Sequence, residues 1–141
     1  MTTLFPCAFF ALAAFAATAA QASELTVEIT DLRTQKGAVM VALIDSAAGW
    51  DDGSKAIARR KLTPEGDQLT LQFADLKPGQ YAVQVMHDEN SNGKLDTNFI
   101  GMPVVEGYGF SNNPRVMRRA KFDEARFEVG AEDQRITVKL R

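Results

Sequence analysis

Hydrophobic and polar residues alternate one by one along much of this chain. Leu25, Val27 and Ile29, for example, are separated by Thr26 and Glu28. Because successive side chains of a strand point to opposite faces, this alternation predicts a strand with one buried and one solvated face. The same alternation recurs at 39–44, 69–73, 81–85, 126–129 and 136–140. We therefore expect six strands, a weaker seventh at 56–61, and no sustained helix.

The segment 39–44 repeats the strand pattern at Val39, Val41 and Leu43, but its second face is apolar as well. Val39, Val41 and Leu43 form one face, and the other face carries Met40, Ala42 and Ile44. Strands that are apolar on both sides are typical of covered positions in a sheet. We therefore expect this strand to be central or covered.

The turn before residue 81 refines the fold class. Pro78 and Gly79 fit a type II turn, in which Pro fixes φ and Gly supplies a positive φ. Tyr81 can return its hydroxyl to the backbone just upstream, as in the tyrosine corner of Greek-key sandwiches; the alternative is an ordinary hairpin with a core tyrosine. The stretch is similar to that of prealbumin-like and carboxypeptidase-regulatory-like domains. The sequence predicts an all-β fold: one Greek-key antiparallel β-sandwich, prealbumin-like or Ig-like, of about seven strands.

A long loop, at 87–121, begins with regularly spaced oxygen-bearing side chains. Its first, third, fifth and ninth positions from residue 88 are Asp88, Asn90, Asn92 and Asp96. Calcium takes six to eight oxygen ligands, and this spacing in a tight loop directs the side chains inward. Gly93 would permit the sharp turn and Lys94 would offer its carbonyl. The loop resembles the Asp-x-Asp-x-Asp-Gly loops of calcium proteins.

Two features of this loop argue for weak calcium affinity. Its twelfth position is Phe99, where a helix-loop-helix site has a bidentate Glu, and only two of the ligands are carboxylates. A second reading needs no metal: Asn92 and Gly93 form a turn, and Asp88, Asn90 and Asp96 bond local backbone amides. Both readings stay open at this point.

The segment that follows combines glycines with aromatic rings and amides. Such a composition predicts a surface for a sugar, peptide or other small ligand, because rings supply contact area and amides supply directional bonds. The alternative is that the aromatic side chains fold back and cap the end of the sandwich. The candidate residues are Phe99, Glu106, Tyr108, Phe110, Asn112, Asn113 and, from an earlier loop, Trp50.

The first 22 residues carry no charged side chain and end in Ala20-Gln21-Ala22. This pattern predicts a cleaved secretory signal at 1–22, followed by one domain at 23–141, with a membrane anchor as the alternative. Cleavage would remove Cys7, the only cysteine, and leave no disulfide. We expect an exported protein, periplasmic or secreted, without stable membrane insertion after cleavage.

The balance of charged residues limits the kinds of partner that the chain can bind. The chain has 16 Lys and Arg against 18 Asp and Glu, which excludes a general nucleic-acid binder. Arg118 and Lys121 belong to a short basic cluster, but Asp123 and Glu124 follow at once, so we expect a salt-paired, solvated face. The predicted partners are an envelope protein, a peptide or a glycan.

The candidates for catalysis are few. His87 is the only histidine and no nucleophile elbow is present, which argues against a Ser-His-Asp hydrolase. Paired carboxylates, such as Asp51 with Asp96 or Asp88 with Glu106, keep a small hydrolase or glycan-active enzyme as the alternative. We expect no enzyme, but a binding or structural module whose loop, with calcium as its candidate ion, orders the aromatic segment.

Three segments together resemble a known family. The run 87–113, the Leu-Lys-Pro-Gly-Gln-Tyr-Ala stretch before it and the segment 122–127 after it are similar to the bacterial exported domain-of-unknown-function family 2141 (DUF2141). The resemblance covers nearly the whole chain after residue 22. It implies export and a β-sandwich, and it brings no established activity or catalytic residues.

Overall fold

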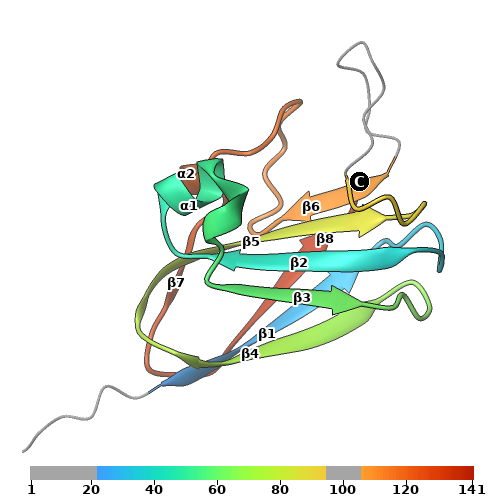
Figure 1. The fold of residues 1–141 in the computed structure, drawn as a ribbon. Helices are drawn as coiled ribbons and strands as arrows, with labels where there is room; N and C mark the ends of the chain where they lie inside the picture. The colour runs from blue at the N-terminus through green and yellow to red at the C-terminus, as the bar shows by residue number, and fades with distance from the viewer. Residues whose placement is uncertain (1–21, 95–105) are drawn as a thin grey trace, which may run out of the picture.

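The computed structural model describes residues 22–94 and 106–141, which form two packed β-sheets (Figure 1). One sheet has the order β4-β1-β8, with β4 at Leu69–Leu76, β1 at Ser23–Thr30 and β8 at Gln134–Lys139. The second has the order β3-β2-β5-β6, at Ala58–Leu62, Ala38–Ile44, Gly79–Asp88 and Gly107–Phe110. Strand β7, Phe127–Val129, pairs with the start of β5. The predicted all-β sandwich is confirmed.

Two strand assignments refine the prediction. The weak segment at 56–61 is β3, which pairs with β2 at the edge of the second sheet. Strand β6 lies inside the predicted loop 87–121, where it pairs with residues 84–87 of β5. Alternation could not indicate β6, because Gly107 and Gly109 carry no side chain that could mark a buried face.

One pairing contradicts the antiparallel prediction. Strands β1 and β8 run parallel, with Val27 opposite Ile136. Parallel neighbours require a long crossover, and here the rest of the domain supplies it, since β1 is the first described strand and β8 the last. Alternation within each strand is the same for either direction, so it could not separate the two.

Three short helices were not expected. They are α1 at Ala47–Asp51, the 3-10 turn η1 at Gly53–Lys55, and α2 at Phe122–Ala125. Helix α1 begins where the Ser46 hydroxyl accepts the Gly49 N–H at 3.1 Å. Helices of three to five residues are too short to show a helical period. Within the described ranges no helix is long and apolar enough to span a bilayer.

The core lies in two parts. The main part fills the space between the sheets and includes Leu25, Val27, Val41, Leu43 and Val85, all fully or almost fully buried. These are the residues that alternation assigned to the inner faces. Figure 1 shows α1 and α2 together beyond one end of the second sheet, and a smaller apolar cluster lies beneath them.

The tyrosine corner is present. The Tyr81 hydroxyl donates to the Lys77 carbonyl at 2.8 Å, across the connection between the two sheets. The predicted type II turn is wrong, since Gly79 does not have a positive φ and Asp75 does, at 59°. Asp75 lies within β4, where the register with β1 shifts, and only Lys77 and Pro78 connect β4 to Gly79, the first residue of β5.

Candidate functional site

The polar loop after β5 is closed by its own side chains. The Asp88 carboxylate is only 4 % exposed and accepts the Asn92 N–H at 3.0 Å and the Gly93 N–H at 2.8 Å. Asn90 Oδ1 accepts the Asn92 N–H at 3.1 Å, and Asn92 Oδ1 accepts the Lys94 N–H at 2.9 Å. Gly93 has a positive φ of 77°, the turn conformation predicted for it.

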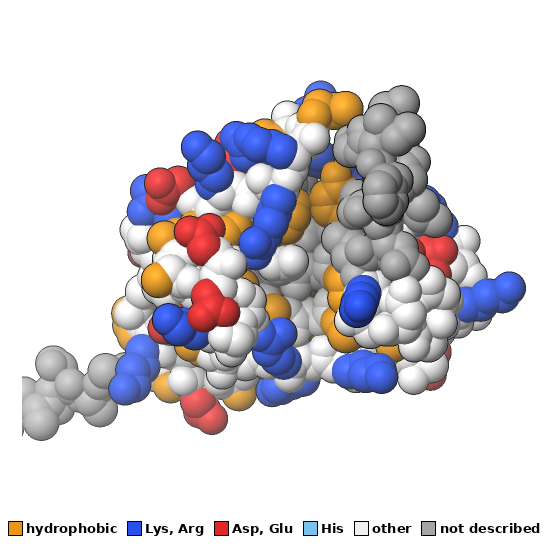
Figure 2. Space-filling view, turned by 45° about the horizontal axis from the view of Figure 1, so that its top comes forward, with side chains coloured by type: hydrophobic (Ala, Val, Ile, Leu, Met, Phe, Trp, Pro, Cys, Tyr) orange, Lys and Arg blue, Asp and Glu red, His pale blue; other side chains and the backbone are white. Residues whose placement is uncertain are grey.

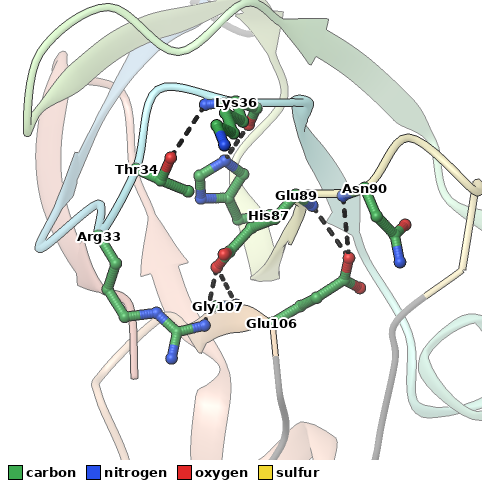
Figure 3. Close-up of polar contacts among 8 residues, drawn as sticks. All are labelled: Arg33, Thr34, Lys36, His87, Glu89, Asn90, Glu106 and Gly107. Carbon is green, nitrogen blue, oxygen red and sulfur yellow. Dashed lines mark hydrogen bonds and ion pairs between the residues drawn. The ribbon is translucent and has the colours of Figure 1, made fainter.

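Two glutamates bond across the base of this loop (Figure 3). Glu106 Oε1 accepts the Glu89 and Asn90 N–H groups, at 3.0 and 3.3 Å, and Glu89 Oε1 in turn accepts the Gly107 N–H at 3.2 Å. Arg33 donates to the same Glu89 oxygen at 2.7 Å. These reciprocal hydrogen bonds join the end of β5 to the start of β6.

His87 lies beside this base and is fully buried. Its Nε2 is 2.8 Å from the Lys36 carbonyl oxygen, which can only accept, so Nε2 carries the proton. Nδ1 has no hydrogen-bond partner among the residues the structure describes. Sequence reasoning identified His87 only as the single histidine, and its structural role at the turn before β2 depends on a contact 51 residues away.

The predicted calcium ligands are brought together only in part. Asp88, Asn90, Asn92 and Lys94 lie in one compact turn, whereas Asp96 lies outside the described residues. Among residues 22–94 and 106–141, no group of three or more His, Cys, Asp or Glu side chains could hold a metal ion. The described loop bonds are those expected for the metal-free reading.

The predicted aromatic surface is largely internal. Trp50 is 1 % exposed and Phe110 is 7 % exposed, with their ring centroids 5.6 Å apart. Trp50 Nε1 donates to the Ala120 carbonyl at 2.8 Å, which satisfies the indole inside the smaller core. Both rings are therefore corrected from surface to core residues, because α1 and α2 fold over them. Tyr108 is half-buried beside Phe110, and Phe99 lies outside the described residues.

The two asparagines after β6 bond backbone groups of other strands. The Asn112 amide donates to the Arg126 carbonyl at 2.6 Å, next to β7. Asn113 pairs with β8, donating to the Thr137 carbonyl at 2.9 Å and accepting the Lys139 N–H at 2.8 Å. Both have positive φ, of 62° and 47°, a conformation that asparagine tolerates better than most residues. These amides hold the fold together, and Asn112 alone of the two is well exposed.

A hollow that sequence reasoning missed lies on the outer face of the second sheet. It has a volume of about 730 Å³, and its floor includes Met40, Ala42, Ile44 and Met86. Met40 lies opposite Met86 in the β2–β5 register, so the two thioethers form one row. The apolar second face of 39–44 was the available signal. It predicted a central or covered strand, and β2 is indeed central, between β3 and β5.

Cations surround this floor. Arg59 and Lys61 of β3 lie opposite Ala42 and Met40, on the same face, and Arg119 lies on another side of the hollow. Figure 2 shows a hollowed face with Lys and Arg side chains around its edge and hydrophobic side chains within. Arg119 is held in place because it donates to the Trp50 carbonyl and, at 3.2 Å, to Gln84 Oε1.

The comparisons with known proteins identify one family. A family model described as "Uncharacterized protein conserved in bacteria (DUF2141)" matches residues 27–137, from β1 to β8. No curated protein and no solved structure matches the chain significantly. Since the matched range covers both sheets, the hollow and the polar loop, the chain belongs to the bacterial family DUF2141.

Proposed function

We propose that the protein is an exported binding module, not an enzyme, whose ligand site is the hollow on the outer face of the second sheet. The observation that carries this proposal is an apolar floor that the described residues leave partly exposed. The outer face of an antiparallel sheet is normally polar, because it meets water. Here Met40, Ala42 and Met86 are only half-buried and line the hollow.

The size of the hollow supports a small ligand. Sites for small molecules usually occupy about 300–1,000 Å³ and combine an apolar lining with a few polar groups. A volume of about 730 Å³ falls within that range. Gln84, which lies on the floor opposite Ala42, adds an amide to an otherwise apolar surface.

A neutral fluorescent probe, N-phenyl-1-naphthylamine, tests this proposal. Its emission rises when it enters an apolar site, and we expect saturable binding to the purified protein. Met40→Glu places a charge on the floor and should weaken binding about tenfold, because the probe cannot pair with a buried carboxylate. The matched control is Ala74→Glu, on the exposed side of β4 in the other sheet.

The control should bind the probe like the wild type. Melting temperatures of both variants establish that they remain folded. Absence of saturable binding to the wild type, or equal loss in the two variants, would overturn the proposal.

The carboxylates of the polar loop support a role other than catalysis. A general acid or base must reach a proton of the substrate. Glu106 is 2 % exposed and Asp88 4 %, and both have backbone N–H groups as partners. Substitution of either residue should therefore change stability, with no hydrolytic activity on glycosides or esters to lose.

We keep calcium binding by the polar loop as a second proposal. The supporting observation is that Asp88 anchors the turn through both carboxylate oxygens and thereby draws Asn90 and Asn92 into the same turn. Calorimetric titration with Ca²⁺ tests it, with Asp88→Asn and Asp96→Asn as variants and Asp67→Asn as an exposed control. Binding heat that is absent in both loop variants and present in the control supports calcium binding by the loop. Absence of binding heat in the wild type contradicts it.

Export belongs to the same proposal and rests on the uncharged, Ala-rich segment 1–22. Residues 1–21 lie outside the described part of the chain. Cell fractionation, with N-terminal sequencing of the mature protein, should find it outside the cytoplasm and starting at Ser23. A cytoplasmic protein of full length would contradict this.

A further inference from the structure

We infer that the hollow binds a small amphiphilic anion, a soluble molecule with one apolar chain and one negatively charged head group. This inference rests on the proposed function and adds the class of ligand. It follows from the position of the cationic side chains around the apolar floor.

The apolar half of the ligand is matched by an apolar floor across two neighbouring strands. Met40 of β2 lies opposite Met86 of β5, and Ala42 and Ile44 extend the apolar surface along β2. Methionine side chains are flexible and polarizable, so they adapt to an alkyl chain of variable conformation. The row therefore favours an unbranched apolar chain over a rigid, hydroxyl-rich sugar.

The charged half is matched by cations alone. Three cations, Arg59, Lys61 and Arg119, line the hollow, with no acidic side chain among the described lining residues. Arg60 also borders it, but its guanidinium lies over the Phe73 ring, 5.2 Å from the ring centre. This is notable in a chain whose acidic residues outnumber its basic ones by 18 to 16. In the described ranges neither Arg59 nor Lys61 forms an ion pair.

Arg59 and Lys61 are placed to meet a head group at the edge of the floor. Both side chains belong to β3, the edge strand, on the face shared with Met40 and Ala42. Long cationic side chains can lie along apolar surface with the charge at the rim. An anion bound there would keep its alkyl chain on the methionines and its charge within reach of both cations.

Arg119 is a prearranged donor on another side of the hollow. Its guanidinium carbon lies 5.4 Å from the centre of the Trp50 ring, and its donors contact Trp50 and Gln84. A guanidinium has five N–H donors in a rigid plane, and it loses little freedom on binding when it is already held. Since Arg119 also stabilises the smaller core, it is unsuitable as a test residue.

The test compares three ligands that share a ten-carbon chain: decanoate, decan-1-ol and decyltrimethylammonium, each below its micelle concentration. Their binding is measured by calorimetry and by displacement of N-phenyl-1-naphthylamine. We expect decanoate to bind at least tenfold more tightly than decan-1-ol, and the cation most weakly. Raising NaCl from 50 to 500 mM should reduce this preference, since exposed charges are screened.

The variant pair is Arg59→Gln with Lys61→Gln, matched to Lys77→Gln with Lys139→Gln, which makes the same charge change outside the hollow. The first pair should reduce the preference for decanoate over decan-1-ol to below threefold. The control pair should keep the preference.

Equal binding of decanoate and decan-1-ol would overturn the anion inference and leave the binding function standing. Failure of every ten-carbon ligand and of the neutral probe would overturn both. Binding to phosphatidylglycerol vesicles without binding to decanoate would also overturn the inference, because it would assign the cations to a membrane surface.

Discussion

Glu124 shows how a single half-buried residue can be strongly held by its neighbours. Arg118 donates to both of its carboxylate oxygens at 2.8 Å, and the Lys121 N–H adds a third bond at 2.8 Å. The hydrogen bonds from Arg118 are the main reason that the pKa of Glu124 falls to about 2. Because the folded pKa lies below that of an ordinary glutamate, ionised Glu124 stabilises the fold above about pH 4.5, and this contribution is lost as the pH falls towards 2.

We predict that Arg118→Gln raises the pKa of Glu124 towards the ordinary value of 4.5. A carboxyl-detected NMR titration measures it, and Arg115→Gln is the control because Arg115 is an exposed member of the same basic cluster. A Glu124 pKa that stays near 2 in Arg118→Gln would show that another group depresses it.

At the residue scale, sequence motifs with a local mechanism were predictable and distant partners were not. The Tyr81 hydroxyl bonds Lys77, four residues away, and the motif indicated it. The sequence left open whether Trp50 is a surface or a core residue, because the buried indole has its hydrogen-bond partner, the Ala120 carbonyl, 70 residues later. No spacing around Trp50 encodes that contact.

At the scale of elements, β6 depends on close contact at a glycine. A Cβ at Gly109 would lie 2.7 Å from the Lys139 carbonyl oxygen and 2.8 Å from Val138 Cγ1, which is closer than real Cβ atoms come. The absence of a side chain thus lets β6 approach β8 of the other sheet. The same absence hid β6 from an analysis of hydrophobic alternation.

We predict that Gly109→Ala lowers the free energy of unfolding by about 1–3 kcal/mol, the usual cost of overpacking. Gly130→Ala is the matched control, since a Cβ there meets nothing within 4 Å, and it should change stability by less than about 1 kcal/mol. Urea unfolding compares the two. Equal effects would contradict a packing role for Gly109.

At the scale of the whole molecule, the sandwich was predictable because each strand carries its own alternation. The hollow was not predictable, because its residues come from different strands and become neighbours only through strand pairing. Met40 lies opposite Met86 on one side and Lys61 on the other. Register between strands far apart in the chain depends on the complete packing. The ligand site is therefore a property of the assembled sheet.

The parallel pairing of β1 with β8 makes the last strand essential to the whole domain. Removal of residues 134–141 would uncover one edge of β1 and take away the buried Val138 and Leu140. We predict that this truncated chain loses cooperative unfolding, as measured by circular dichroism and NMR dispersion. Addition of a synthetic 134–141 peptide should restore it, and a truncated chain that melts like the wild type would contradict the prediction.

The same pairing has a consequence for biosynthesis. A ribosome makes β1 before β8, so the first strand waits for this partner until all the strands between them have been translated. Until then β1 lacks one of its two neighbours in the sheet. For an exported protein this delay is an advantage, because a translocation channel that threads unfolded polypeptides would receive the chain before it can fold in the wrong compartment.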